Sequence, residues 1–319
     1  MKLQLVLLLI FASLPPCRAS AANSPPRQLL AEGRADDAIR VLQEQVNQRP
    51  GDAESFNLLC RAYFMSDNWD PALAACQRAI NLAPQNSMYQ LWLGRVYGEK
   101  ADHSSFLSAA GLAKQARIAF ERAVQLDPRN WEARADLGEF YAEAPGIIGG
   151  GKDKARAQAD ALLSLNPAMG HWVLARIAEK DKQPALAEQE YRAEIAASHS
   201  GARAWLDLAG FLRAEKRFDE LLQALHGVDS SPLDRPEALM HAAHQLFRAN
   251  LDLPFAVALL RRYLKAPVED GPAFKAHDLL GQIYEKQGDI RAAADEFRAA
   301  LALARSYKNA QENLKRVDH

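Results

Sequence analysis

The sequence predicts an all-α protein, built as a right-handed α-solenoid of antiparallel helix pairs. The first observation is a pattern of apolar and small residues that recurs at a period of about 34 residues, which is typical of stacked helix–turn–helix units. The second is the length of 319 residues. Length alone would allow two domains, but a stacked array can grow to this size as one body, because each unit buries its apolar face on its neighbours.

The clearest repeat unit is residues 53–86. Leu59 and Tyr63 lie one turn apart on a first predicted helix, and Ala72 and Ala79 lie on a second, where small side chains let the two helices approach. The same pattern divides the predicted solenoid of residues 22–319 into a capping half-repeat at 25–52, seven repeats at about 53–86, 87–130, 131–167, 168–201, 202–235, 237–273 and 274–307, and a C-terminal capping helix at 308–319.

Two of these units are longer than the others. The unit that begins at residue 87 has an insertion at residues 100–112, and the next has one at residues 144–151. The second insertion is rich in glycine and places Ile147 and Ile148 in a predicted loop. Apolar side chains in a loop need cover, so we expect either a structural loop or one that contacts a partner.

The repeated motif gives the sequence a family resemblance. Leu93-Gly94 with Tyr97, Leu137-Gly138 with Tyr141 and Leu280-Gly281 with Tyr284 repeat one spacing. The chain resembles tetratricopeptide-repeat proteins over nearly all of its length after the first residues. With its Ala-Pro-Gly-Ile-Ile-Gly-Gly insertion it is similar to uncharacterised secreted or periplasmic bacterial members. The resemblance implies a non-enzymatic scaffold that binds a protein or peptide on its concave face.

The first residues are typical of a secretory signal peptide. Met1-Lys2 is followed by an apolar run to Leu14, and Ala19-Ser20-Ala21 has the small residues of a cleavage site. We therefore expect residues 1–21 to be removed after Ala21 and the protein to be periplasmic or secreted. A lipid anchor on Cys17 or an uncleaved anchor are alternatives. No later stretch is long and apolar enough to cross a membrane, and a net charge of −1 gives no indication of nucleic-acid binding.

Catalytic and cofactor motifs are not found. Gly146 to Asp153 is one residue short of a phosphate-binding loop and lacks the serine or threonine that holds magnesium, so Asp153 is expected to be a helix N-cap instead. His241 and His244 lie one helical turn apart, but no third ligand accompanies them. We expect no enzyme activity, no cofactor and no metal.

Two cysteines remain after the predicted cleavage. Cys60 and Cys76 lie on the two helices of one repeat at positions that face their shared seam. Because exported proteins meet an oxidising compartment, the pair is predicted to form a disulfide. Two buried free thiols are the alternative, since cysteine is a good small core residue.

A partner groove can be predicted from helical geometry. Side chains beside the seam residues of successive first helices would face the concave side, and they include arginines, which bind carboxylates well. The predicted groove residues are Asn57, Arg61, Trp92, Arg95, Trp172 and Arg176. Ordinary ion pairs are the other interpretation of these arginines. An alternative function is a small-molecule or lipid-binding solenoid of an envelope transport system, which a closed apolar cavity would favour.

Overall fold

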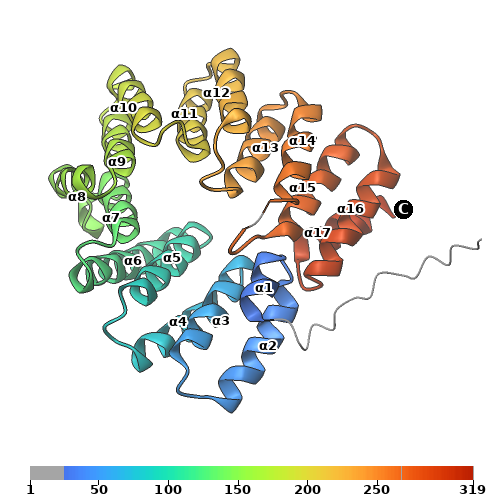
Figure 1. Ribbon diagram of the computed structural model, residues 1–319, viewed down its shortest axis with the longest axis horizontal. Coiled ribbons are helices and arrows are strands. Elements are labelled where there is room, and N and C mark those ends of the chain that lie inside the picture. The colour runs from blue at the N-terminus through green and yellow to red at the C-terminus, as the bar shows by residue number, and fades with distance from the viewer. Residues whose placement is uncertain (1–24, 267, 319) are drawn as a thin grey trace, which may run out of the picture.

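A computed structural model describes residues 25–266 and 268–318, and all regular structure in them is helical (Figure 1). The predicted signal peptide lies outside the described residues. The elements are α1 (Pro26–Ala31), α2 (Ala35–Gln48), α3 (Ala53–Met65), α4 (Trp69–Leu82), α5 (Ser87–Asp102), α6 (Phe106–Leu126), α7 (Trp131–Glu143), the 3-10 turn η2 (Gly146–Ile148), α8 (Lys152–Leu165), α9 (Pro167–Lys180), α10 (Pro184–Ala197), α11 (Ala202–Ala214), α12 (Phe218–Ser230), α13 (Glu237–Ala249), α14 (Leu253–Tyr263), α15 (Ala273–Lys286), α16 (Ile290–Leu303) and α17 (Lys308–Val317).

Consecutive helices pair, and the pairs stack side by side into an all-α solenoid (Figure 1). The glycine of the repeated Leu-Gly motif has a steric role in two of the pairs. A Cβ atom on Gly94 would lie 2.4 Å from the ring of Phe120, and one on Gly281 would lie 2.4 Å from the ring of Phe297. These glycines let an aromatic residue of the second helix pack directly on the backbone of the first, which explains why the motif recurs.

Several helices begin at a capping side chain. An Asp or Asn oxygen accepts a hydrogen bond from a backbone N–H of the first turn, which would otherwise lack a partner. These caps are Asp52, Asn86, Asn130, Asn166, Asp252 and Asp289. The cap before α8 differs from the expectation: Gly151 occupies that position, and Asp153 lies within the first turn of the helix. A carboxylate there is still favourable, because it faces the positive end of the helix dipole.

The two insertions take different forms. The first lengthens the helices on either side, so that α6 runs for 21 residues. The second forms the turn η2, which ends at Gly149 with a φ of 103°. That left-handed conformation favours glycine. The glycine-rich sequence is therefore explained by the turn itself.

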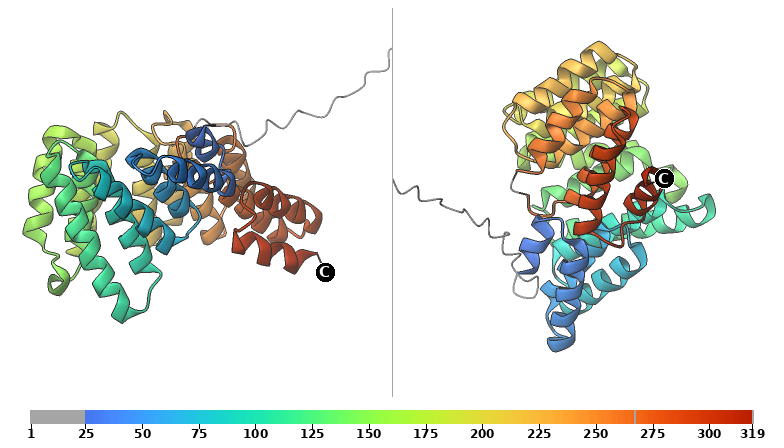
Figure 2. Two further views of the ribbon diagram at one scale, coloured as in Figure 1. Left: turned by 90° about the horizontal axis from the view of Figure 1, so that it is seen from below. Right: turned by 90° about the vertical axis from the view of Figure 1, so that its right-hand side faces the viewer.

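The two ends of the solenoid meet. Helix α1 lies beside the C-terminal helices in Figure 1 and in the left view of Figure 2. The backbone N–H of Gly271, in the loop before α15, donates a hydrogen bond to the carbonyl oxygen of Leu30 at the end of α1, at 3.1 Å. Ser306 donates a second bond from its hydroxyl to Asp36 at 2.6 Å. We call this junction of α1–α3 with residues 268–306 the closure contact.

An apolar core and an ion cluster hold the closure contact together. Phe274 of α15 is fully buried and packs in one cluster with Leu29 and Leu30 of α1. Arg61 of α3 donates from Nε to Asp270 at 2.6 Å and from Nη2 to Glu269 at 2.9 Å. Segments more than 200 residues apart in the sequence therefore share a core and a partly buried ion cluster.

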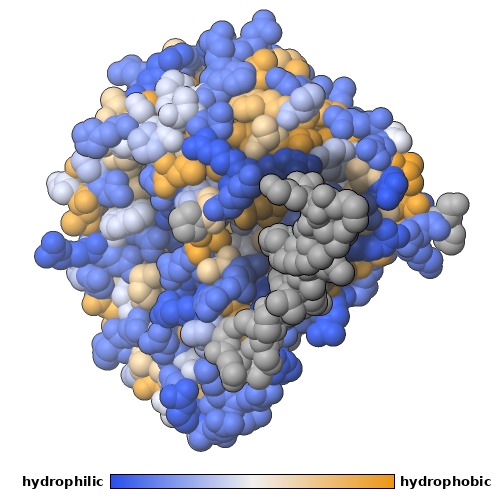
Figure 3. All heavy atoms as spheres, turned by 45° about the vertical axis from the view of Figure 1, so that its right-hand side comes forward, coloured by the Kyte–Doolittle hydropathy of each residue, from blue (hydrophilic) through white to orange (hydrophobic). Residues whose placement is uncertain are grey.

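The solvent-facing surface is mixed in polarity. On the face drawn in Figure 3, hydrophilic residues predominate and apolar residues occur in small separate groups. Two large apolar side chains are nevertheless almost fully exposed, Phe106 at 88% and Ile147 at 86%. Both belong to the two insertions. No helix among the described residues is long and apolar enough to cross a membrane.

The structure joins Cys60 of α3 to Cys76 of α4 in a disulfide, and both side chains are fully buried. A bridge that closes a loop of this length is expected to contribute about 3 kcal/mol to the free energy of unfolding. The oxidised chain should therefore unfold at a clearly higher urea concentration than the reduced chain. A Cys60→Ala/Cys76→Ala variant should resemble the reduced chain and should not respond to reductant. Equal midpoints for oxidised and reduced protein would contradict this prediction.

Candidate functional site

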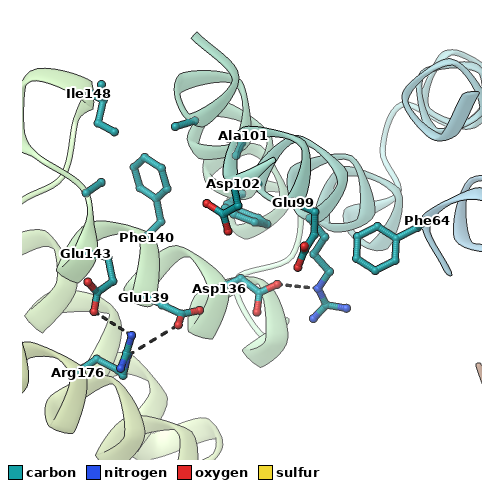
Figure 4. A pocket seen from close by; sticks show the side chains of 16 residues that line it. Phe64, Glu99, Ala101, Asp102, Asp136, Glu139, Phe140, Glu143, Ile148 and Arg176 are labelled. Carbon is teal, nitrogen blue, oxygen red and sulfur yellow. Dashed lines mark hydrogen bonds and ion pairs between the residues drawn. The ribbon is translucent and has the colours of Figure 1, made fainter. Parts of the chain in front are cut away.

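The inner side of the solenoid contains a cavity of about 630 Å³ (Figure 4). Helices α5 and α7 provide most of its wall, and Phe64 of α3, Phe120 of α6 and Arg176 of α9 complete it. The insertions contribute as well, through Asp102 at the end of α5 and Ile148 of η2. We call this space the inner cavity.

The inner cavity carries more acidic than basic side chains. Its two guanidinium groups are already paired: Arg95 donates to Asp136 at 2.7 Å, and Arg176 lies 2.9 Å from Glu143. Arg176 also donates to Glu179 at 2.6 Å, just outside the cavity. Against these two cations stand five carboxyl groups, those of Glu99, Asp102, Asp136, Glu139 and Glu143.

Three of the carboxyl groups have neither a hydrogen bond nor an ion pair shorter than 3.8 Å among the described residues. They are Glu99 and Asp102 of α5 and Glu139 of α7. Burial raises the pKa of Glu99, and the neighbouring Asp102 adds to the effect. Burial likewise raises the pKa of Glu139 to about 7, against the opposing effect of Arg176 at 3.8 Å. Negative charge is therefore crowded in the inner cavity and poorly compensated.

The raised pKa of Glu139 predicts a pH effect on stability. The folded chain holds a proton between pH 4.5 and about 7 that the unfolded chain releases, so this contribution to stability is lost as pH rises through that window. Since 43% of the side chain faces solvent, screening reduces the effect to about 1 kcal/mol. Glu139→Gln should thus stabilise the chain at pH 8 and have little effect at pH 4.5.

Urea unfolding at the two pH values tests this prediction. Glu44→Gln, a change on an exposed side chain of α2, is the matched control and should alter stability equally little at both. If Glu139→Gln gives the same change in free energy at pH 8 as at pH 4.5, Glu139 does not titrate as described.

A second cavity of about 440 Å³ adjoins the first. Glu139 and Arg176 line both, and Asp207, His241 and His244 line the second. Burial raises the pKa of Asp207, against the opposing charge of Arg203, and burial lowers the pKa of both histidines. Among the described residues no group of three or more His, Cys, Asp or Glu could hold a metal ion.

The predicted groove residues have different places in the structure. Arg95 and Arg176 line the inner cavity, and Trp172 lines the second cavity although it is only 8% exposed. Asn57 is buried at 6% exposure, so its expected place in an open groove is wrong. Arg61 is also misplaced, because it forms the closure contact.

Trp92 lies between two of the predicted arginines rather than in an open groove. The guanidinium groups of Arg61 and Arg95 each lie 5.2 Å from the centre of its ring, and Phe64 meets it edge-on at 5.5 Å. These cation–π contacts fix the arginines on the inner side. The predicted contact loop is also divided: Ile148 lines the inner cavity, whereas Ile147 points to solvent.

The acidic character of the inner cavity was missed by the sequence analysis. Asp136, Glu139 and Glu143 follow one another at intervals of three and four residues, which places them on one face of α7. Glu99 and Asp102 have the same relation on α5. The spacing of these acidic residues on α5 and α7 could therefore have predicted an acidic face on two successive first helices.

Family models of the tetratricopeptide repeat match residues 29–95 and 274–316. The yeast Tom70 structure is similar in fold, with a TM-score of 0.54 and 18% identity, over 98% of this chain and 66% of that one. A thermophilic tetratricopeptide-repeat protein of Thermus thermophilus aligns over 59% of this chain and 95% of its own, at 21% identity and a TM-score of 0.49. The chain therefore carries tetratricopeptide repeats within an all-α helical repeat solenoid.

One similar sequence is a curated protein with a known assembly role. The type IV pilus assembly protein PilF of Pseudomonas aeruginosa is 30% identical over 125 residues, which is 38% of this chain. The match spans about half of that protein, 48% of its length.

Proposed function

We propose that this chain is an exported, non-enzymatic scaffold that binds a protein or peptide partner on the inner side of its solenoid. The observation that carries the proposal is the pair of adjoining cavities. Residues from several successive inner helices line them. A continuous surface of this kind suits an extended chain better than a single compact ligand. The similarity to a pilus assembly protein supports a role in protein assembly.

The alternative, a lipid or small-molecule carrier, is supported less well. Five carboxyl groups and two guanidinium groups line the inner cavity, and burying charges beside an acyl chain is costly. The two insertions contribute Asp102 and Ile148 to the wall of the inner cavity. Its lining, however, is not that of a closed apolar cavity.

Site-specific photo-crosslinking in the envelope fraction tests the proposed function. A benzophenone amino acid in place of Phe140, which lines the inner cavity, should capture a discrete partner. The same amino acid in place of Phe218, an exposed aromatic residue at the start of α12, is the control and should not. Equal capture at both positions, or capture only at Phe218, would contradict the proposal.

N-terminal sequencing tests the predicted export. The first residue of the exported chain should be Ala22.

A further inference from the structure

We infer that the inner cavity receives a basic segment of the partner, with Lys or Arg side chains three residues apart. The inference rests on the proposed function and names the chemistry of the partner. It begins from the excess of negative charge, since five carboxyl groups face two guanidinium groups that are already paired. Glu99 and Asp102 have no ion-pair partner among the described residues, and Glu139 has only the long contact with Arg176 at 3.8 Å. A bound cation would supply what these carboxyl groups lack, and charge-assisted hydrogen bonds are the strong ones.

The apolar part of the cavity wall also suits a cationic side chain. Phe64, Phe120 and Phe140 line the inner cavity together with the carboxyl groups. Aromatic faces attract ammonium and guanidinium groups, and they cover the methylene stems of lysine and arginine. A cation–π contact of this kind is present nearby, where the guanidinium of Arg203 lies 5.1 Å from the ring centre of Trp172.

Unpaired atoms of the inner wall indicate a peptide rather than a free polyamine. The Nε donors of Arg176 and Arg213 and the Oε1 acceptor of Gln245 have no hydrogen-bond partner among the described residues. All three side chains line the two cavities, and their unpaired atoms are buried, so a side-chain rotation that turns them toward the cavity would give them a partner on a ligand. A peptide backbone offers both the acceptors and the donors that they need, whereas a polyamine offers donors alone.

The spacing of the acidic helices sets the spacing of the basic residues. Glu99 and Asp102 lie on α5, and Glu139 lies on α7, which contacts α5 directly. Packed helices lie about 8–10 Å apart. A peptide in the polyproline II conformation advances about 3.1 Å per residue and has three residues per turn, so every third side chain returns to the same face. Cationic residues three positions apart would therefore reach one acidic helix each.

A peptide-binding measurement with the purified chain tests the inference. The probe is a fluorescein-labelled nine-residue peptide of serine and alanine with lysine at every third position. Its binding is measured by fluorescence anisotropy at low salt and pH 8, where Glu139 is ionised. Glu99→Gln/Glu139→Gln should weaken binding about tenfold or more, because both lost charges face the bound lysines. Asp160→Asn/Asp295→Asn removes two exposed charges from the outer helices α8 and α16 and should change the affinity less than about twofold.

Two companion peptides and the polyamine spermine make each outcome decisive. A peptide with glutamate at the same positions should not bind, and one with three adjacent lysines should bind more weakly. If the glutamate peptide binds in an Arg95-dependent manner, the scaffold stands and the basic partner is wrong. If spermine competes as well as the lysine peptide and binds as tightly, the occupant is a small cation. If no peptide of any charge binds and Phe140 captures nothing in cells, both the inference and the proposed function fail.

Discussion

Replacing Phe274 by alanine is expected to lower the free energy of unfolding by about 3–5 kcal/mol. The side chain is fully buried and meets Tyr307 edge-on at a ring distance of 4.9 Å. It also belongs to the core that contains Leu29 and Leu30, so the variant leaves a cavity in the closure contact itself. Urea unfolding measures the loss of stability.

A matched variant separates opening of the closure contact from general destabilisation. Phe297 is equally buried, but it packs on Gly281 inside the last repeat. Phe297→Ala should cost a similar free energy. The Gly271 amide, which donates to Leu30, should exchange hydrogen rapidly in Phe274→Ala while it remains protected in Phe297→Ala. Equal protection of that amide in both variants would show that Phe274 does not hold the ends together.

Arg61→Met is expected to cost about 3 kcal/mol, because it leaves Asp270 as a poorly solvated carboxylate without its cation. The side chains of Arg61 and Asp270 are only 11% and 21% exposed, and burial already raises the pKa of Asp270 against the opposing charge of Arg61. The loss should shrink as pH falls and Asp270 takes up a proton, since the neutral carboxyl needs no partner. Urea unfolding at pH 7 and pH 4 measures both effects.

The double variant Arg61→Met/Asp270→Leu distinguishes charge from packing. It removes both ions of the partly buried pair and leaves only the exposed Glu269, which keeps Arg27 as a partner, so it should be more stable than Arg61→Met alone. Arg40→Met, an exposed arginine of α2 with side-chain exposure of 45%, is the control and should change stability by less than about 0.5 kcal/mol. A double variant as unstable as Arg61→Met would mean that the ion pair is not the source of the loss.

Local patterns determined much of what the sequence could predict about the fold. Two copies of the Leu-Gly motif mark a backbone that passes close to an aromatic ring, as Gly94 and Phe120 show. That contact depends on residues in one repeat. The closure contact depends instead on the accumulated rotation of all the repeats. Gly33 illustrates the difference: its φ of 69° follows from the local turn after α1, but a Cβ there would also lie 2.6 Å from the carbonyl oxygen of Gly271. The repeat pattern of the sequence does not predict this contact between Gly33 and Gly271.

The sequence predicted where two residues of the candidate site lie better than it predicted the charge of that site. Helical geometry predicted Arg95 and Arg176 as groove residues, and in the structure both line the inner cavity. Their partners could not be predicted from one repeat, because Asp136 belongs to the next unit and neutralises Arg95 across the stack. A cavity expected to attract acidic groups is therefore acidic itself. The burial of Trp172 has a related cause, since Arg203 from the following unit covers its ring.

Zero-length cross-linking tests the central claim, that the two ends of the solenoid meet, most directly. The Nζ atom of Lys275 on α15 lies 2.8 Å from a carboxylate oxygen of Asp67, just after α3. Carbodiimide treatment of the dilute protein should join them in an amide bond, identified by mass spectrometry of the monomer. The ion pair of Lys100 with Asp70, between neighbouring units, is the positive control. Cross-linking at both pairs is the predicted result, and cross-linking of Lys100 with Asp70 alone would contradict the closed arrangement.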